Sequence, residues 1–285
     1  LDIRKDSPRR STALVEALGV LRAKKALEPI IASWDYLDSV RLQMDLTAQL
    51  QVLRSAVVEA LGQIGGEGAS NILMEGLDDP DQGVVEKAVK GLGRLRERKA
   101  VEAIIALSAR GGNMAQTCYE ALGAIGNDRC LAPLEKGMRS ENPMDQVAPA
   151  YGLALMGKKE GVRKLDDLVE NSPLGDKAAL LAAYYLARLD KKAGLDHLVQ
   201  LIEAEGSSLQ VPAAEALGKS GNKRAVLPLV EALGGAEPGL RLIIARGLGR
   251  LGGPRSVHAL RKLQEDPNPA VRGAAGMALE ELGED

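Results

Sequence analysis

Leucine returns at nearly fixed spacing along the chain, and this spacing constrains the fold more than any other feature of the sequence. The first step is 43 residues, and the following steps are 31, 30, 31, 33, 31, 31 and 31 residues. A period near 31 that persists is typical of stacked-repeat proteins, in which each repeat buries its apolar face against its neighbours. The ladder consists of Leu18, Leu61, Leu92, Leu122, Leu153, Leu186, Leu217, Leu248 and Leu279.

Each of these leucines lies in a helical pattern, which we call the B helix of its repeat. With the leucine as position 0, residues 271–282 are apolar at −8, −5, −4, −1, 0 and +3, the spacing of one helix face. Apolar residues near +9 and +12 predict a second helix, the A helix. Its first turn is marked at +11 by Pro29, Pro133 and Pro228, where proline costs a helix little. We therefore expect nine B helices and eight A helices.

Glycine or alanine occupies positions −1 and +1 of most B helices, as in Gly91 and Gly93. Glycine inside a helix costs about 1 kcal/mol relative to alanine, so close approach of a neighbouring helix is the expected compensation. Gly247-Leu248-Gly249 follows no predicted strand, so it lacks the context of a dinucleotide-binding loop. We interpret these glycines as a packing signal.

Residues 271–279 and 216–222 resemble HEAT repeats, most closely the short HEAT-like repeats of the phycobilisome lyase type, with the pattern V-R-x-A-A-x-x-A-L-G-x-I-G-D. The resemblance covers residues 11–285. It implies an all-α, right-handed α-solenoid of about nine HEAT-like helix pairs, whose B helices line a concave groove. Residues 1–10 are then an N-terminal tail or remnant, and residues 11–285 form a single solenoid.

The long first step inserts about a dozen residues around 33–46. We expect a turn at 33–36 followed by an unusually long B helix from Asp38, and the alternative is a protruding loop over 34–46. The insertion holds the only tryptophan, Trp34. This ring either covers the open end of the stack or contacts a partner.

The −2 position of each B helix points away from its apolar face, and the resemblance implies that it faces the groove; tyrosine gathers near this position in the middle of the chain. Tyrosine is common at interfaces because its ring buries apolar area while its hydroxyl stays hydrogen-bonded. The alternative is that these rings fill space around the irregular repeats, as we expect for Tyr185. The candidate groove residues are Tyr119, Tyr151, Tyr184, Glu120, Glu215 and Arg246.

Basic residues follow the B helices, and acidic residues fill most of the opposite turns. The helix dipole explains much of this pattern, because cations are favoured at helix C-termini. The functional alternative is a basic edge that docks a nucleic acid or another phosphate-bearing partner. The candidate residues of this basic edge are Arg94, Arg96, Arg98 and Lys99.

No residue pattern predicts catalysis, a metal site or a cofactor. His197 and His258 are not followed by glutamate, unlike the His-Glu pairs of the di-iron hydroxylases built on HEAT repeats, and we expect both to be partly exposed. Cys118 and Cys130 are either two reduced core thiols or an intra-repeat disulfide. The net charge of −2 gives no reason to expect general affinity for nucleic acid or membranes.

The sequence therefore predicts a non-enzymatic scaffold or assembly factor that binds a protein or peptide in its groove. Two alternatives stay open: a subunit of a phycobilin-type chromophore lyase, and binding of a nucleic acid or phosphate-bearing partner along the basic edge. We expect a cytoplasmic protein without a membrane span. Because the chain begins at Leu1 without methionine, it is either trimmed or processed, and export stays open.

Overall fold

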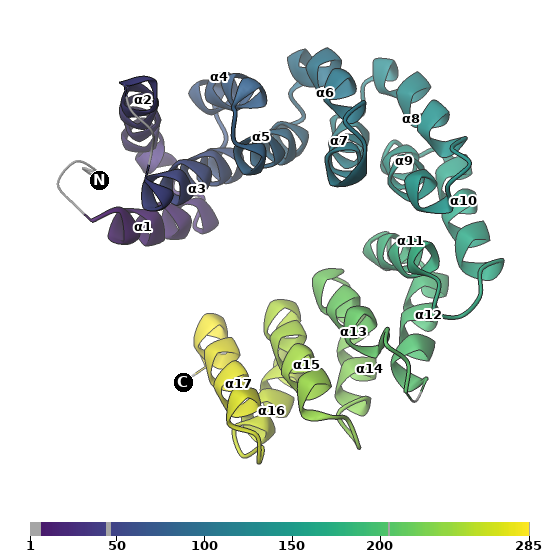
Figure 1. The fold of residues 1–285 in the computed structure, drawn as a ribbon. Coiled ribbons are helices and arrows are strands. Elements are labelled where there is room, and N and C mark those ends of the chain that lie inside the picture. The colour runs from purple at the N-terminus through teal and green to yellow at the C-terminus, as the bar shows by residue number, and fades with distance from the viewer. Residues whose placement is uncertain (1–6, 44–46, 205, 285) are drawn as a thin grey trace. The chain divides into compact units, whose positions relative to one another are not determined.

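A computed structural model describes residues 7–43, 47–204 and 206–284, and within these ranges it contains only helices and their connections (Figure 1). Odd-numbered helices are the nine predicted B helices and even-numbered helices the eight A helices, which confirms the repeat pattern. The B helices are α1 (Pro8–Val20), α3 (Ala48–Ile64), α5 (Gln82–Leu95), α7 (Gly112–Ile125), α9 (Pro143–Leu155), α11 (Lys177–Arg188), α13 (Gln210–Lys219), α15 (Pro238–Leu251) and α17 (Pro269–Leu282).

The A helices are generally shorter, and several are preceded by a turn of 3₁₀-helix. They are α2 (Leu27–Gln43), α4 (Glu67–Glu75), α6 (Val101–Ser108), α8 (Leu131–Met138), α10 (Lys159–Glu170), α12 (Lys192–Glu203), α14 (Val226–Glu231) and α16 (Pro254–Leu263). Pro29, Pro133 and Pro228 each lie at the third residue of an A helix, as the +11 column predicted. None of the described helices is both long enough and apolar enough to cross a membrane.

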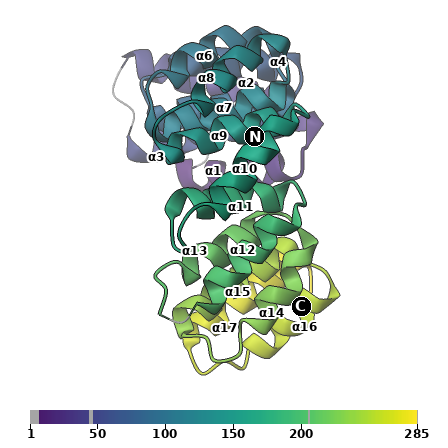
Figure 2. The same ribbon diagram turned by 90° about the vertical axis from the view of Figure 1, so that its right-hand side faces the viewer.

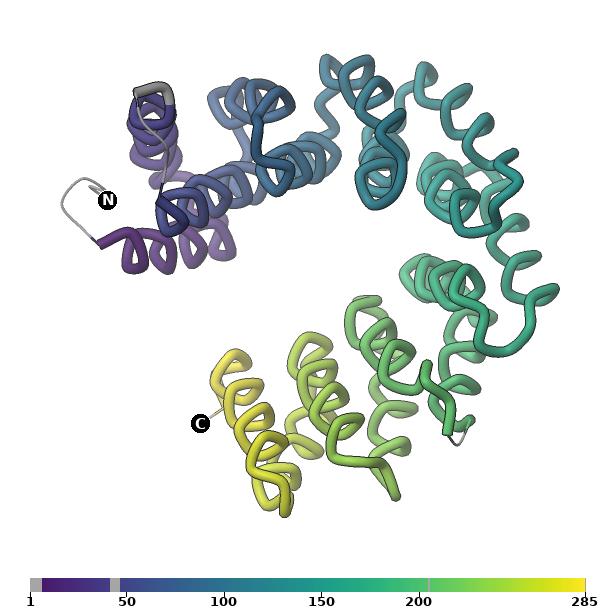
Figure 3. Tube along the Cα trace, in the orientation of Figure 1, coloured from purple at the N-terminus to yellow at the C-terminus, as the bar shows by residue number. Residues whose placement is uncertain are grey.

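The repeats form two compact units, residues 1–159 and 160–285. Helices α1 to α9 make up the first unit, and α10 to α17 the second, apart from Lys159 at the start of α10. Within each unit, successive helix pairs stack in chain order, as Figures 2 and 3 show for α13, α15 and α17. That residues 11–285 act as a single solenoid stays a prediction.

Successive B helices touch backbone to backbone through small residues, as the glycine columns predicted. A methyl group added at Gly62 would lie 2.7 Å from Cα of Gly91, and one at Gly218 would lie 2.5 Å from Cα of Gly247. In both pairs the +1 position of one B helix meets the −1 position of the next. The same contact joins Gly19 to Ala60, Gly93 to Ala121, Gly123 to Gly152, and Gly249 to Ala278.

Every B helix is followed at position +4 by a residue with positive φ. Six of the nine are glycine, which adopts this conformation without strain. The other three are Arg22, Arg96 and Asp190, with φ of 49°, 54° and 57°. A left-handed residue with a side chain costs about 1–2 kcal/mol, so two basic residues stand where glycine would be more stable.

The region of the long first step differs from the prediction. Helix α2 runs from Leu27 to Gln43, straight through the predicted turn at 33–36. The inserted residues therefore lengthen A helix α2 as well as B helix α3. Nothing in the segment 27–43 breaks a helix after Pro29, which explains the continuous structure. The end of the predicted loop, residues 44–46, lies outside the described residues, as do residues 1–6 of the predicted tail. Helix α1 already begins at Pro8, capped by Ser7.

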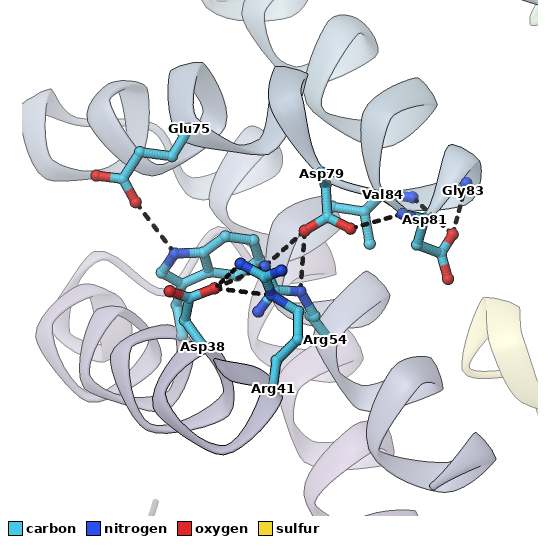
Figure 4. Close-up of polar contacts among 9 residues, drawn as sticks. Asp38, Arg41, Arg54, Glu75, Asp79, Asp81, Gly83 and Val84 are labelled. Atoms are coloured by element: carbon cyan, nitrogen blue, oxygen red, sulfur yellow. Dashed lines mark hydrogen bonds and ion pairs between the residues drawn. The ribbon is translucent and has the colours of Figure 1, made fainter. Parts of the chain in front are cut away.

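Trp34 is buried rather than presented to a partner. Its ring lies 3.8 Å from the guanidinium carbon of Arg54, and its Nε1 donates to Glu75 at 3.3 Å (Figure 4). Arg54 is itself buried and donates to the carboxylate of Asp79 at 3.1 and 2.5 Å. Asp79 in turn accepts from the backbone of Asp81, which caps α5.

The same contact between an arginine of a B helix and the aspartate of the following turn recurs in the second unit. Arg241 of α15 donates to both carboxylate oxygens of Asp266 at 2.7 and 2.9 Å, and Asp266 accepts from the backbone of Asn268, which caps α17. This hydrogen-bonded arginine holds the pKa of Asp266 below its usual range. An arginine at −7 of one B helix thus anchors the turn that starts the next one.

Replacing Gly218 with alanine is expected to destabilise the second unit by about 1–3 kcal/mol, because the new methyl group forces α13 and α15 apart. Gly273, inside α17, has open space around the position of a methyl group. Gly273→Ala should therefore stabilise the same unit by up to about 1 kcal/mol. Urea unfolding followed by circular dichroism measures both, and a Gly218→Ala protein as stable as wild type would contradict the close-packing interpretation.

Asp79→Asn is expected to cost the first unit about 1–3 kcal/mol, because it removes the buried counter-ion of Arg54 and leaves only the partly exposed Asp38, 3.1 Å from its Nη2. The neighbouring Asp78 is exposed, so Asp78→Asn is a matched control that should stay within about 0.5 kcal/mol of wild type. Denaturant unfolding of the two variants checks this difference; equal stabilities would show that the ion pair contributes nothing.

Candidate binding surface

The candidate groove residues fall into both units, so each group is described within its own unit. Tyr119, Glu120 and Tyr151 belong to the first unit, on α7 and α9, while Tyr184, Glu215 and Arg246 belong to the second, on α11, α13 and α15. Their side chains differ widely in exposure. Only part of the predicted set can therefore meet a partner.

Tyr151 does not lie on an open surface. Its side chain is 3% exposed, and all seven residues from Val147 to Leu153 are buried. The assignment from the −2 column was wrong because it assumed a polar outer face, and α9 has none between Val147 and Leu155. A helix that is apolar all round is buried all round. The absence of polar residues in this stretch is the signal that should have indicated burial.

The side chain of Tyr119 is only partly accessible to solvent. It is half-buried and packs against the hydrophobic core of the first unit, with its ring beside Gly137 of α8. Glu120 on the same helix is half-buried. In the first unit, the prediction that Tyr151 faces a groove is therefore wrong, and Tyr151 fills space as the alternative expected, whereas a groove role of the half-buried Tyr119 and Glu120 stays a prediction.

In the second unit the candidate residues are accessible. Tyr184 is half-buried, with its ring 5.2 Å from the buried ring of Tyr185 and 5.6 Å from the guanidinium carbon of Arg188. Arg246 is exposed, and Met277, at the same −2 position of α17, is 64% exposed. Tyr185 is fully buried, as expected.

Glu215 stands among three cations. Lys219, one turn along α13, donates to it at 2.6 Å, and Arg246 and Arg250 of α15 lie near enough for their charge to act on it. The hydrogen bond from Lys219, with the added charge of the two arginines, lowers the pKa of the Glu215 carboxyl. Positions −2 and +2, which the sequence assigned to groove and edge, therefore meet in one patch. We use the name B-helix surface of the second unit for the half-buried Tyr184 and Glu215 together with the exposed Arg188, Lys219, Arg246, Arg250 and Met277.

The basic edge of the first unit is exposed along its whole length. Arg94 lies in the last turn of α5, Arg96 caps that helix in the left-handed conformation, and Arg98 and Lys99 begin the next 3₁₀ turn. Glu97 in their midst accepts from the backbone of Lys99. The side chains are available to solvent, and their role as a docking edge stays a prediction.

Three of the four cysteine and histidine residues, which could be chemically reactive, are buried. Cys118 and Cys130 are free, buried thiols, and burial raises the pKa of Cys118 to about 12. His197 is 7% exposed, which corrects the expectation of partial exposure, and burial lowers its pKa. His258 is exposed. Within the described ranges, no three His, Cys, Asp or Glu residues group closely enough to hold a metal ion.

Tyr151→Ala is expected to cost about 3 kcal/mol or more, because it empties a buried site. Tyr184→Ala should cost less, about 1–2 kcal/mol, since Tyr184 is only partly buried. Denaturant unfolding of both single variants tests this ranking. A large loss with Tyr184→Ala and none with Tyr151→Ala would reverse the assignment of core and surface.

Family models match several parts of the chain. The model described as HEAT repeats matches residues 39–113 and 226–285, and the model described as PBS lyase HEAT-like repeat matches residues 213–235. These ranges include α3 to α6 of the first unit and α14 to α17 of the second.

Two curated proteins are similar in sequence over part of the chain. RNA-binding protein 20 of Sus scrofa is 30% identical over 141 residues, which is 47% of this chain and 11% of that protein. Phycocyanobilin lyase subunit alpha of a Picosynechococcus strain is 34% identical over 96 residues, which is 29% of this chain and 36% of that protein. The chain thus spans about a tenth and about a third of the lengths of these relatives.

Two solved structures align with most of the chain. Human deoxyhypusine hydroxylase, in complex with glycerol, aligns with a TM-score of 0.46 and 19% identity, over 94% of this chain and 100% of that chain. The CpcE–CpcF complex of phycocyanin lyase from Nostoc sp. PCC7120 aligns with a TM-score of 0.45 and 20% identity, over 90% and 93% of the two chains.

Proposed function

Because this chain is a HEAT-repeat protein, we propose that it binds another protein or a peptide segment through the B-helix surface of its second unit, as a non-enzymatic scaffold or assembly factor. The observation that carries the proposal is the surroundings of Glu215. Glu215 pairs with Lys219 alone, and Arg246 and Arg250 of the next B helix lie near enough for their charge to act on the same carboxylate, so the patch keeps an excess of positive charge that carboxylates of a partner would balance.

The apolar residues of this surface would supply the anchoring contact. The partly exposed ring of Tyr184 lies beside the guanidinium of Arg188. Met277 is a flexible apolar side chain with most of its surface in solvent. Aromatic and arginine residues dominate the binding energy at many interfaces, whereas exposed ion pairs contribute about 1 kcal/mol or less each. We therefore assign affinity mainly to Tyr184, and orientation and association rate to Arg246 and Arg250.

The test is retention of proteins from an extract of the source organism by the immobilised chain. Tyr184→Ala should reduce the affinity of the identified partner by about tenfold or more. Arg246→Glu with Arg250→Glu should weaken binding most at low salt, because long-range attraction is screened as salt rises. Affinity measured by titration calorimetry at two salt concentrations separates these effects.

The matched control reverses two charges in the other unit. Arg94→Glu with Arg98→Glu changes the net charge equally, but on the basic edge of the first unit. It should leave the affinity unchanged. If it abolishes binding while Arg246→Glu with Arg250→Glu does not, the partner uses the basic edge, and retention on heparin then tests a phosphate-bearing partner.

A second candidate is a subunit of a phycobilin-type chromophore lyase. It is supported by the similarity to phycocyanobilin lyase subunit alpha and by the match to the PBS lyase HEAT-like repeat at residues 213–235. Absorbance spectra of the purified chain after incubation with phycocyanobilin test this candidate. A bilin spectrum that shifts and stays with the protein through gel filtration would favour the lyase role over the scaffold.

A further inference from the structure

A hollow of about 370 Å³ lies between A helices α10 and α12 of the second unit and is open to solvent. One face of α12 supplies Ala193, Asp196, His197 and Gln200 to its wall. The end of α10 and the loop at 171–176 supply the rest. Because small-ligand sites begin at about 300 Å³, this hollow suits a side chain or a small molecule better than a large cofactor.

His197 lines the hollow as a buried polar group that lacks a hydrogen bond. Its side chain belongs to a residue that is 7% exposed, and its Nε2 has no hydrogen-bond partner among the described residues. Buried polar atoms are nearly always paired, because an unpaired one costs about 1–3 kcal/mol. Burial lowers the pKa of this imidazole, so at neutral pH it is uncharged and can accept a hydrogen bond. A donor held in the hollow would supply the missing partner.

Carboxylates gather at the end of α10 that borders the hollow. Burial and the like charges of Glu170 and Asp167 raise the pKa of Asp166, and the opposite charge of Lys191 lowers it. The last turn of α10 contains no basic residue, and carboxylates at a helix C-terminus oppose the helix dipole. A cation bound beside Glu170 would therefore relieve two unfavourable interactions.

The α12 side of the hollow adds one more carboxylate. Asp196 is paired with Lys192 at 3.1 Å, but the side chain of Lys192 is 85% exposed. Such exposed pairs within a helix contribute only about 0.3–0.5 kcal/mol, so a ligand can displace this lysine at little cost. The charges of both helices thus favour a positively charged ligand.

An arginine side chain matches these groups better than a metal ion does. Within the described ranges, no three His, Cys, Asp or Glu residues group closely enough to hold a metal ion. A guanidinium carries five N–H donors in one plane, which suits acceptors that come from different elements. Its aliphatic stem would cover Val169, Leu174 and Ala193, and Leu174 is 57% exposed without it.

We propose that the hollow between α10 and α12 binds an arginine side chain of a partner protein, through Glu170, Asp196 and the neutral imidazole of His197. The site lies on A helices and does not depend on the B-helix surface. Each of the two proposals can therefore fail its own test without the other.

The probes are two capped tripeptides that carry arginine or lysine between two glycines. The chain has two histidines, so its histidine NMR spectrum contains one reporter in the site and one internal reference. The arginine peptide should shift the side-chain resonances of His197 in a saturable manner and leave those of His258, which is exposed on α16, unchanged. The lysine peptide should bind at least about threefold more weakly, because an ammonium has fewer donors.

Glu170→Gln with Asp196→Asn removes both carboxylates from exposed positions and should weaken binding of the arginine peptide by about fivefold or more. The matched control is Glu265→Gln with Glu280→Gln, which removes two exposed carboxylates from α17 and the end of α16. Because these lie outside the hollow, the control should bind like wild type.

His197→Phe keeps a ring but removes the acceptor, and it should weaken binding by about threefold or more. Backbone amide resonances of residues 193–200 report binding in this variant. If circular dichroism shows that it does not fold, the two carboxylate variants decide the question, because their changes are on the surface.

Three results would overturn the proposal. The first is that the arginine peptide leaves His197 unchanged or shifts His258 equally. The second is that the lysine peptide binds as tightly as the arginine peptide. The third is that Glu170→Gln with Asp196→Asn binds no more weakly than the control, which would show that the attraction comes from the overall charge of the unit.

Discussion

Successive B helices lie so close that a hydrogen atom is the largest side chain that fits at position +1 of most repeats. The pairs Gly62 with Gly91 and Gly218 with Gly247 set this distance, and where one partner of such a glycine contact is alanine, it is the −1 residue. Polar positions of neighbouring repeats are consequently brought near each other. Glu215 interacts with both arginines of α15 because α13 and α15 are held together by such a pair.

Most of the fold could be predicted because the features that build it repeat. The leucine ladder gave the number of helix pairs, proline at +11 marked the start of A helices, and the glycine columns indicated helix contacts that the structure contains. The region 33–46 could not be placed in this way because it occurs once. There the local sequence decided, and uninterrupted helix formers extended α2 through the expected turn. The anchoring of Arg54 on Asp79 was missed, although Asp-Pro-Asp at 79–81 and Asp-Pro-Asn at 266–268 recur as a sequence signal.

The binding residues were harder to predict. A repeat position such as −2 indicates which way a side chain points only when its helix has the same polar and apolar faces as the neighbouring helices. Arg246 is exposed and Glu215 half-buried, as the −2 position of an amphipathic helix predicts, and their role in a groove stays a prediction. The assignment fails for Tyr151, because α9 lacks a polar face. Lys219 and Arg250, at position +2, lie near residues at position −2. This proximity could not be predicted from either helix alone, because it depends on how α13 and α15 pack together.

Alanine takes the place of glycine at position +1 in α9 and α11, the B helices that flank the boundary between the two compact units. In a linear array, cooperativity passes only from neighbour to neighbour, through the interface that each repeat shares with the next. We therefore expect each compact unit to unfold as a block of its own, with species in which one unit is folded and the other is not, so that a single melting temperature would not describe the molecule.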